Sequence, residues 1–198
     1  MNLGLTYTKD ADGSKVMSMP DETREWVISF VRQNARKSPA EIEAMIQEGH
    51  RELLAALEVV SEAQAAYKPG ADDWSILELV AHVVSVKQVL AALAGSLRKG
   101  ELPPGFGPQF EEAKMQDGFI VRRFETLAQA REAAQAAHES IVGFVRGIDD
   151  SVNTDVTFRH FYFGAFNARE WPVFQRVHDG DHTPHIGKIK ASSGYPAA

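Results

Sequence analysis

The sequence predicts an all-α protein in which four long helices form a bundle, preceded by one short helix. Apolar residues recur with helical spacing in each long segment, serine and glutamate residues mark two helix starts, and strand-like alternation of apolar and polar residues is not convincing anywhere. A chain of 198 residues is long enough for one domain with a proper core and short for two. We therefore expect an N-terminal arm and short helix over residues 1–37 and a single bundle over residues 38–198.

The first two helices follow from apolar spacing and from one N-terminal cap. Residues 22–36 predict a short amphipathic helix. Ser38 and Glu41 form a capping box, and the proline after the serine suits the first helical position, where a backbone N–H is not needed. The apolar stripe continues to Val60, so we expect this second helical segment to close only at the proline–glycine pair 69–70.

The next helix has the clearest start signals in the chain. Ser75 and Glu78 form a second capping box, and Trp74 and Leu79 have the spacing of a hydrophobic staple around it. Apolar residues at helical spacing extend this helix to about Arg98. It is therefore the helix whose position in the sequence is best determined.

Two more helices and two loops complete the chain. A loop rich in proline and glycine, 100–108, precedes a long helix over 119–146, whose apolar residues recur every seven positions. An aromatic loop over 149–167 separates it from the last helix, 168–190. Each proline inside that helix costs about 3 kcal/mol and each glycine about 1 kcal/mol. Packing or a bound ligand must therefore hold the last helix straight, or it is kinked.

Composition excludes several classes of function. The net charge is −6 with both signs interspersed, which argues against nucleic-acid binding. The absence of cysteine excludes disulfides, thiolate metal sites and a cysteine nucleophile, so any reacting thiol must come from a small molecule. No run approaches the ~20 apolar residues of a membrane span, and the first residues lack the pattern of a secretory signal. We expect a cytoplasmic protein with neither a nucleic-acid nor a membrane partner.

Three histidines have the spacing of a metal site. His178 and His182 are four residues apart, which on a helix places both imidazoles on one face, about 6 Å apart along the axis. A third imidazole from another helix, His82, would give a three-histidine site with an open coordination position, as in catalytic metal sites. Taken separately, each histidine is more simply a buried core or rim residue, and spacing alone leaves both interpretations open.

Further polar residues near these histidines have two possible roles each. His185 would lie about 10 Å along the axis from the first histidine of the pair, so we interpret it as a pocket residue or as a hydrogen-bond partner of a ligand. Asp181 could accept a ring N–H, or it could be solvated. Glu78 has the same two roles, with its capping role favoured. His138 lies on the seam of its helix and could face a pocket, whereas His50 is expected on a helix surface.

Three stretches of the sequence are similar to motifs of a known family. The first is E-L-L-A-A-L-E-V-V-S-E-A-Q-A-A-Y-K-P with D-D-W-S-I-L-E-L-V-A-H after it, the second is F-Y-F-G-A-F-N-A-R-E-W, and the third is H-D-G-D-H-T-P-H-I. Together they span about 41–190 and resemble the DinB/YfiT-like four-helix bundles, a superfamily that includes metal-dependent thiol S-transferases. The resemblance implies an up-down-down-up bundle, frequent dimers, and a Zn²⁺ or Ni²⁺ ion bound by His82, His178 and His182.

The resemblance and the absence of cysteine lead to three functional hypotheses. The first is a thiol S-transferase that uses a low-molecular-weight thiol, such as bacillithiol or mycothiol, on a small-molecule substrate. The second is a metal-dependent hydrolase, in which the ion lowers the pKa of bound water to about 7. The third is a metal-binding, stress-related dimer without catalysis. The catalytic residues are unknown, and transfer ranks slightly ahead of hydrolysis because it depends less on a general base.

Overall fold

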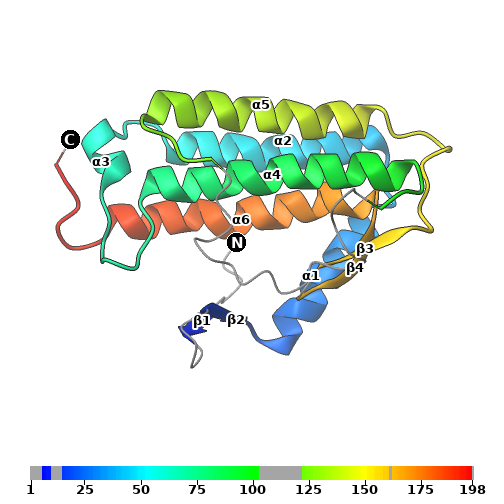
Figure 1. Cartoon of the computed structure of the whole chain (residues 1–198), viewed down its shortest axis with the longest axis horizontal. Coiled ribbons are helices and arrows are strands. Elements are labelled where there is room, and N and C mark those ends of the chain that lie inside the picture. Colours follow the sequence, from blue (N-terminus) through cyan, green and yellow to red (C-terminus); the bar gives the residue numbers. More distant parts are fainter. Residues whose placement is uncertain (1–5, 10–14, 103–121, 161, 198) are drawn as a thin grey trace.

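The chain folds into a helical bundle flanked by two small hairpins (Figure 1). The computed structural model describes residues 6–9, 15–102, 122–160 and 162–197. The long helices are α2 (Pro39–Ala56), α4 (Ile76–Arg98), α5 (Leu127–Arg146) and α6 (Glu170–Lys190), and the shorter ones are α1 (Asp21–Asn34) and α3 (Glu62–Ala66). The antiparallel hairpins pair β1 (Thr6–Lys9) with β2 (Lys15–Ser18) and β3 (Thr157–His160) with β4 (Gly164–Asn167).

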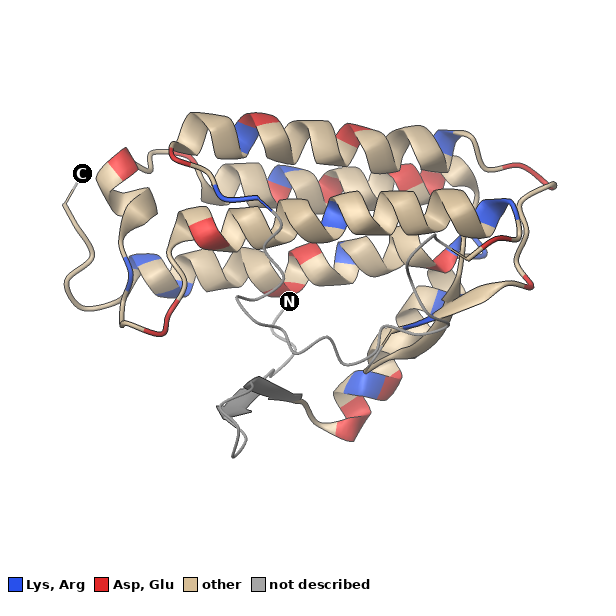
Figure 2. Cartoon of the chain, in the orientation of Figure 1, with Lys and Arg blue, Asp and Glu red and all other residues tan. Residues whose placement is uncertain are grey.

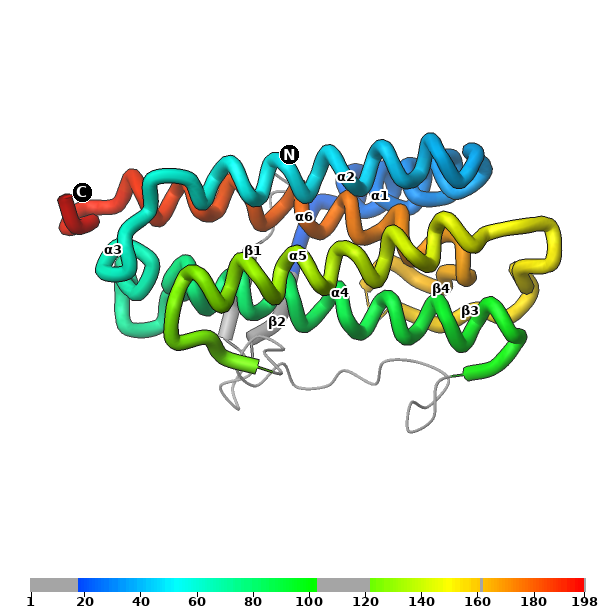
Figure 3. Tube along the Cα trace, turned by 90° about the horizontal axis from the view of Figure 1, so that it is seen from above, coloured from blue at the N-terminus to red at the C-terminus, as the bar shows by residue number. Residues whose placement is uncertain are grey.

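The four long helices have an up-down-down-up arrangement. Both α2 and α4 pack against α5 and against α6, so α2 and α4 lie on a diagonal of the bundle. Figure 1 shows α2 and α6 running in one direction and α4 and α5 in the other, and Figure 3 shows α2 beside α6 and α4 beside α5. The predicted fold class is therefore confirmed. The additional helix α1 packs against α6, and the division of the chain between residues 37 and 38 stays a prediction.

The two predicted capping boxes begin α2 and α4. The Ser38 hydroxyl accepts the backbone N–H of Glu41, and the Glu41 carboxylate accepts the backbone N–H of Ser38. Ser75 and Glu78 make the same reciprocal pair at the start of α4. The second box fixes the first turn of α4, from which His82 projects one to two turns later.

The last helix is continuous despite its helix-breaking residues. α6 runs from Glu170 to Lys190 with Pro184 inside it. Before its first turn, the Asn167 side chain accepts the backbone N–H groups of the next residues, including that of Glu170, and the Glu170 carboxylate accepts the N–H of Asn167. α6 packs on both α2 and α4, and this packing offsets its low helix propensity. Of the alternatives expected from the sequence, packing, a bound ligand or a kink, the structure therefore contains the packing.

Two helix boundaries differ from the prediction. The second helical segment does not continue to 69–70, because α2 ends at Ala56 and a new capping box at Ser61 begins α3. The helix expected over 119–146 begins at Leu127, because the Thr126 hydroxyl caps its first turn. Residues 122–125 precede that cap and are not helical, whereas 119–121 and most of the predicted 100–108 loop lie outside the described residues.

Val59, in the break after α2, has a left-handed backbone conformation that an asparagine would adopt more easily than a valine. Val59 has a φ of 52° and its side chain is 94% exposed, and a β-branched residue is strained in this left-handed region. We expect Val59→Asn to raise the free energy of unfolding by about 1 kcal/mol, because asparagine tolerates this conformation. Urea unfolding measures the change, with the neighbouring exposed substitution Glu58→Asn as control. A Val59→Asn protein no more stable than the control would contradict the expectation.

The hairpins do not follow from the sequence pattern, because strands of four residues are too short to show alternation. The second hairpin lies inside the predicted aromatic loop and pairs Phe158 with Phe166, both fully buried. Between its strands, the Tyr162 hydroxyl accepts the backbone N–H of Met19, and its carbonyl accepts a hydrogen bond from Arg24 Nε. The aromatic loop therefore attaches α1 to the bundle.

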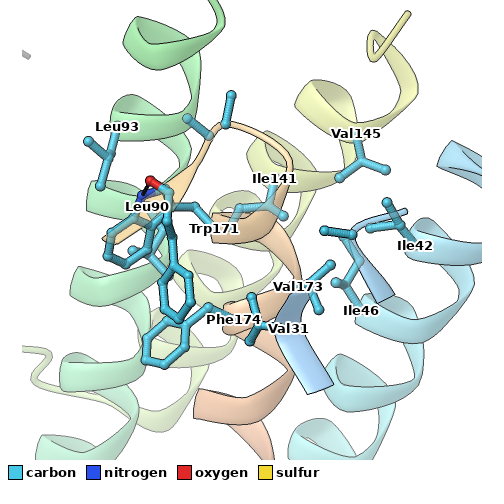
Figure 4. Close-up of a cluster of buried hydrophobic side chains, with 14 of the residues drawn as sticks. Val31, Ile42, Ile46, Leu90, Leu93, Ile141, Val145, Trp171, Val173 and Phe174 are labelled. Atoms are coloured by element: carbon cyan, nitrogen blue, oxygen red, sulfur yellow. Dashed lines mark hydrogen bonds between the residues drawn. The ribbon is translucent and has the colours of Figure 1, made fainter. Parts of the chain in front are cut away.

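The core divides into two apolar clusters, one toward each end of the bundle. Figure 4 shows the cluster nearer α1, where Trp171 of α6 lies beside Leu90 of α4 and Val173 of α6 lies beside Ile46 of α2. Each long helix contributes at least one buried polar residue at the level between the clusters: His50, Lys87, His138, Gln175 and Asp179. A polar layer therefore crosses the middle of the bundle.

One helix in the described part of the chain, α4, is long and apolar enough to cross a membrane by composition, with a mean hydropathy of 1.7. In the structure 61% of that stretch is buried, and α4 packs against two of the other long helices. Its apolar character is therefore explained by its place in the core. On the bundle, acidic and basic residues are interspersed along the helices (Figure 2).

Candidate metal centre

The structure brings the three predicted histidines together between α4 and α6. One ligand atom from each of His82, His178 and His182 lies within 4.8 Å of the other two. The Nε2 atoms of His82 and His178 are 3.1 Å apart, and the ring centroids of the three imidazoles are 4.4 to 5.0 Å apart. His82 and His182 are buried, and His178 is partly buried.

Helix geometry explains this arrangement. His178 and His182 are one turn apart on α6 and share a face, as their spacing predicts. α4 lies beside α6 in the opposite direction, and the capping box at Ser75 sets where His82 falls along that contact. Pro184 lies beyond the pair without interrupting the helix, so both imidazoles keep their helical spacing.

The environment keeps two of these imidazoles neutral. Burial lowers the pKa of His178 and that of His182 well below the ordinary histidine value, and the neighbouring imidazoles lower both further. For His178 the charge of Lys87 also contributes. Neutral imidazoles have a ring nitrogen with a free lone pair at physiological pH, so metal binding at this site would not require proton release from them.

The donor set fits a divalent transition metal. Zn–N distances of about 2.0–2.1 Å correspond to a separation of about 3.3–3.4 Å between ligand nitrogens in tetrahedral geometry. The 3.1 Å between the His82 and His178 nitrogens is close to this value. The ligand atoms of all three histidines lie within 4.8 Å of one another, so small side-chain movements would bring them to tetrahedral spacing. Imidazole ligands suit zinc and nickel, and three protein ligands leave a position for water or substrate.

An aromatic side chain forms one wall of the site. The Trp74 ring centroid lies 4.9 Å from that of His82 and 6.2 Å from that of His182. Trp74 is partly buried and packs on the apolar cluster that contains Leu79, in line with the predicted staple. It therefore shields two of the three imidazoles from solvent.

Glu78, one of the residues expected near the site, is engaged in other contacts. Its carboxylate accepts the backbone N–H of Ser75 and pairs with Lys68 and Arg123 at 3.0 and 3.1 Å. Burial raises the pKa of Glu78, but the Ser75 N–H and the two cations outweigh it, so the net pKa is lowered. The capping role and these two ion pairs account for the position of the Glu78 carboxylate.

His185 and Asp181 lie on α6 near the histidines and are not members of the three-residue cluster. Both are partly buried. Burial lowers the pKa of His185, Lys188 lowers it further, and Asp73 opposes this change. The charge of a protonated His185 would reach His182, whose pKa it lowers, so His185 lies beside the site.

The polar layer was not expected from the sequence, and the surface position predicted for His50 is wrong. His50 is 4% exposed and its ring stacks on that of His138, with centroids 4.1 Å apart and planes at 11°. Burial lowers the pKa of His138 to about 3, with His50 and Lys87 acting in the same direction and Glu43 opposing them. The stacked pair joins α2 to α5.

A fully buried ion pair completes the layer. Lys87 Nζ of α4 lies 3.0 Å from Asp179 Oδ2 of α6, and the two side chains are 0% and 1% exposed. Gln175 Nε2 donates to Asp179 Oδ1 at 2.7 Å. The sequence did contain a signal for this pair, because Lys87 follows Val83 by four residues and therefore lies on the buried stripe of its helix.

Comparison with known proteins supports this interpretation of the fold. The family model described as the DinB superfamily matches residues 45–186, a range that includes all three histidines. A solved structure of YfiT from Bacillus subtilis aligns over 99% of this chain and 100% of its own, with a TM-score of 0.53 and 15% sequence identity. That protein is described as "a probable metal-dependent hydrolase with an unusual four-helix bundle topology". No curated protein matches the sequence.

Proposed function

Since the chain belongs to the DinB superfamily, we propose that it is a metal-dependent enzyme whose divalent ion is bound by His82, His178 and His182. The observation that carries the proposal is the convergence of three imidazoles from two helices within 4.8 Å. YfiT, which shares the fold, is described as metal-dependent, and this supports the same property here. Zinc and nickel are the ions that we propose.

The residues around the site would perform distinct tasks. The three imidazoles supply nitrogen ligands from one side, and Trp74 limits the access of water from another. A bound ion would supply Lewis acidity, which either activates water or holds a small thiol as its thiolate. The substrate would be a small molecule bound next to the open coordination position.

We favour thiol transfer over hydrolysis as the reaction. Hydrolysis needs a base that accepts a proton from water, and Glu78 is engaged by Lys68 and Arg123, so this role would fall to Asp181 or His185. Transfer of a low-molecular-weight thiol to an electrophile has a smaller need for such a base, and the chain supplies no thiol of its own. Hydrolysis is the second candidate, supported by the description of YfiT. A homodimer in the cytoplasm remains part of the proposal.

The metal site is tested by removing one ligand. We expect wild-type protein to bind about one divalent ion per chain, and His182→Ala to lower its affinity at least ~100-fold, because loss of an outer partner alone costs 10–100-fold. Isothermal titration with Zn²⁺ and with Ni²⁺ measures both values. His185→Ala is the matched control on the same helix, with an affinity expected within about 10-fold of wild type.

Two outcomes would contradict the proposal. Equal, negligible metal binding by wild type and His182→Ala would remove the site, and equal losses in His182→Ala and His185→Ala would assign the effect to a general disturbance of α6. The reaction is tested with metal-loaded protein, a chromogenic aryl halide and a series of low-molecular-weight thiols, with nitrophenyl esters in parallel. Thiol-dependent conjugation that is lost in His182→Ala supports transfer, and ester cleavage with the same dependence supports hydrolysis.

A further inference from the structure

Two buried polar atoms near the metal centre have no hydrogen-bond partner among the described residues. One is Nδ1 of His178, the ring nitrogen opposite the Nε2 that faces His82. The other is the carbonyl oxygen Oε1 of Gln175. Both side chains belong to α6 and are three residues apart, the spacing at which helical side chains are neighbours. A ring nitrogen that can donate and a carbonyl that can accept thus lie buried and unsatisfied about one helical turn apart.

The orientation of the Gln175 amide is determined by its other partner. Its Nε2 donates to Asp179 Oδ1 at 2.7 Å, and an ionised carboxylate can only accept. The amide therefore cannot be turned over without placing two acceptors against each other. Lys87 holds Asp179 in turn, with its Nζ 3.0 Å from the second carboxylate oxygen. Contacts therefore run from Lys87 to Asp179 and from Asp179 to the Gln175 amide nitrogen, which leaves the Gln175 carbonyl oxygen pointing away from Asp179.

From these contacts, and resting on the proposed metal site, we infer that Gln175 is a positioning residue for His178. The carbonyl of Gln175 accepts the Nδ1–H of His178 when Nε2 binds the ion, and Asp179 keeps the amide in the orientation that makes this possible. A metal-binding histidine almost always donates its other ring N–H to such an acceptor, which fixes the tautomer and strengthens the ligand.

The ion pair has separable effects on folding and on metal binding. Removing Lys87 leaves the Asp179 carboxylate buried and uncompensated, but the carboxylate still holds the Gln175 amide. Removing the amide of Gln175 leaves the ion pair intact and takes away the acceptor for His178. A purely structural role of the polar layer would make metal affinity follow stability in both variants, whereas a positioning role separates the two properties.

The experiment compares Zn²⁺ affinity, by chelator competition, with the urea stability of the metal-free protein. Gln175→Met preserves side-chain length and is expected to lower Zn²⁺ affinity about 10–100-fold. Lys87→Met is expected to destabilise the fold more but not to lower the affinity. Gln64→Met is the matched control, because it removes another buried amide, one that bonds the C-terminal tail, and should leave the affinity unchanged.

The results separate this inference from the proposed function. Wild-type binding with unchanged affinity in Gln175→Met would overturn the inference alone, as would parallel losses that follow stability in Gln175→Met and Lys87→Met. Absence of wild-type binding would overturn both. If Lys87→Met does not fold, Gln175→Met and Gln64→Met still decide the question. In metal-loaded wild type, proton NMR should also show a slowly exchanging imidazole N–H of His178 that is lost in Gln175→Met.

Discussion

Replacing Lys87 by methionine is expected to lower the free energy of unfolding by about 3–5 kcal/mol, because the Asp179 carboxylate is left buried without its partner. Both side chains are almost completely inaccessible to solvent, at 0% and 1% exposure, so water cannot compensate the lost contact. Asp179→Asn is expected to lower the free energy of unfolding by a similar amount, because it leaves the Lys87 ammonium group buried without its partner. Urea unfolding of the metal-free proteins measures these changes.

The double variant is the control for this interpretation. Lys87→Met combined with Asp179→Asn leaves no buried charge, and the new amide can still accept from Gln175. We expect it to be more stable than either single variant, since replacing a buried ion pair as a whole is often neutral or stabilising. Additive losses in the double variant would mean that the two residues act separately. A double variant at least as stable as wild type would mean that stability alone does not explain why the pair is present.

The metal-free protein is expected to lose stability as the pH falls below about 6.5. Burial lowers the pKa of His138 and that of His160 to about 3, whereas both titrate near 6.5 in the unfolded chain. Between these values the unfolded state binds more protons than the folded state, so acid favours unfolding. Two such histidines correspond to a loss of about 3 kcal/mol between pH 6.5 and 5. Urea unfolding across this range measures the slope.

Single variants assign this slope to particular residues. His138→Phe keeps an aromatic ring against His50 and cannot titrate, so we expect the pH dependence to fall by about one proton. Most carboxylates titrate below this range, which separates them from the histidines. A slope that is the same in wild type and in His138→Phe would show that this histidine is protonated in the folded protein as readily as in the unfolded one.

The sequence was sufficient for the features that depend on local chemistry. The capping boxes at Ser38 and Ser75 are local in sequence, and the structure contains both. The spacing of His178 and His182 translates directly into a shared helix face. The bundle itself follows from apolar periodicity, which reports the buried side of each helix before any partner is known.

Features that depend on contacts between distant segments could not be predicted in the same way. The apolar stripe continued past Ala56, yet a cap at Ser61 and the backbone at Val59 end α2 there. The surface position expected for His50 is wrong because its ring stacks on that of His138 of α5, a contact that the sequence of α2 alone does not reveal. The partner of Lys87 lies 92 positions later in the chain, on another helix.

The positions of the histidines give a bound ion a role as a cross-link. His82 and His178 are separated by 96 residues in sequence, and the chain has no cysteine with which to form a disulfide. A link closing a loop of about 100 residues removes conformational entropy from the unfolded chain worth about 4.7 kcal/mol in the simplest model. Occupancy of the site would thus tie the middle of the chain to its last helix, and the free energy of unfolding would rise with the concentration of free metal.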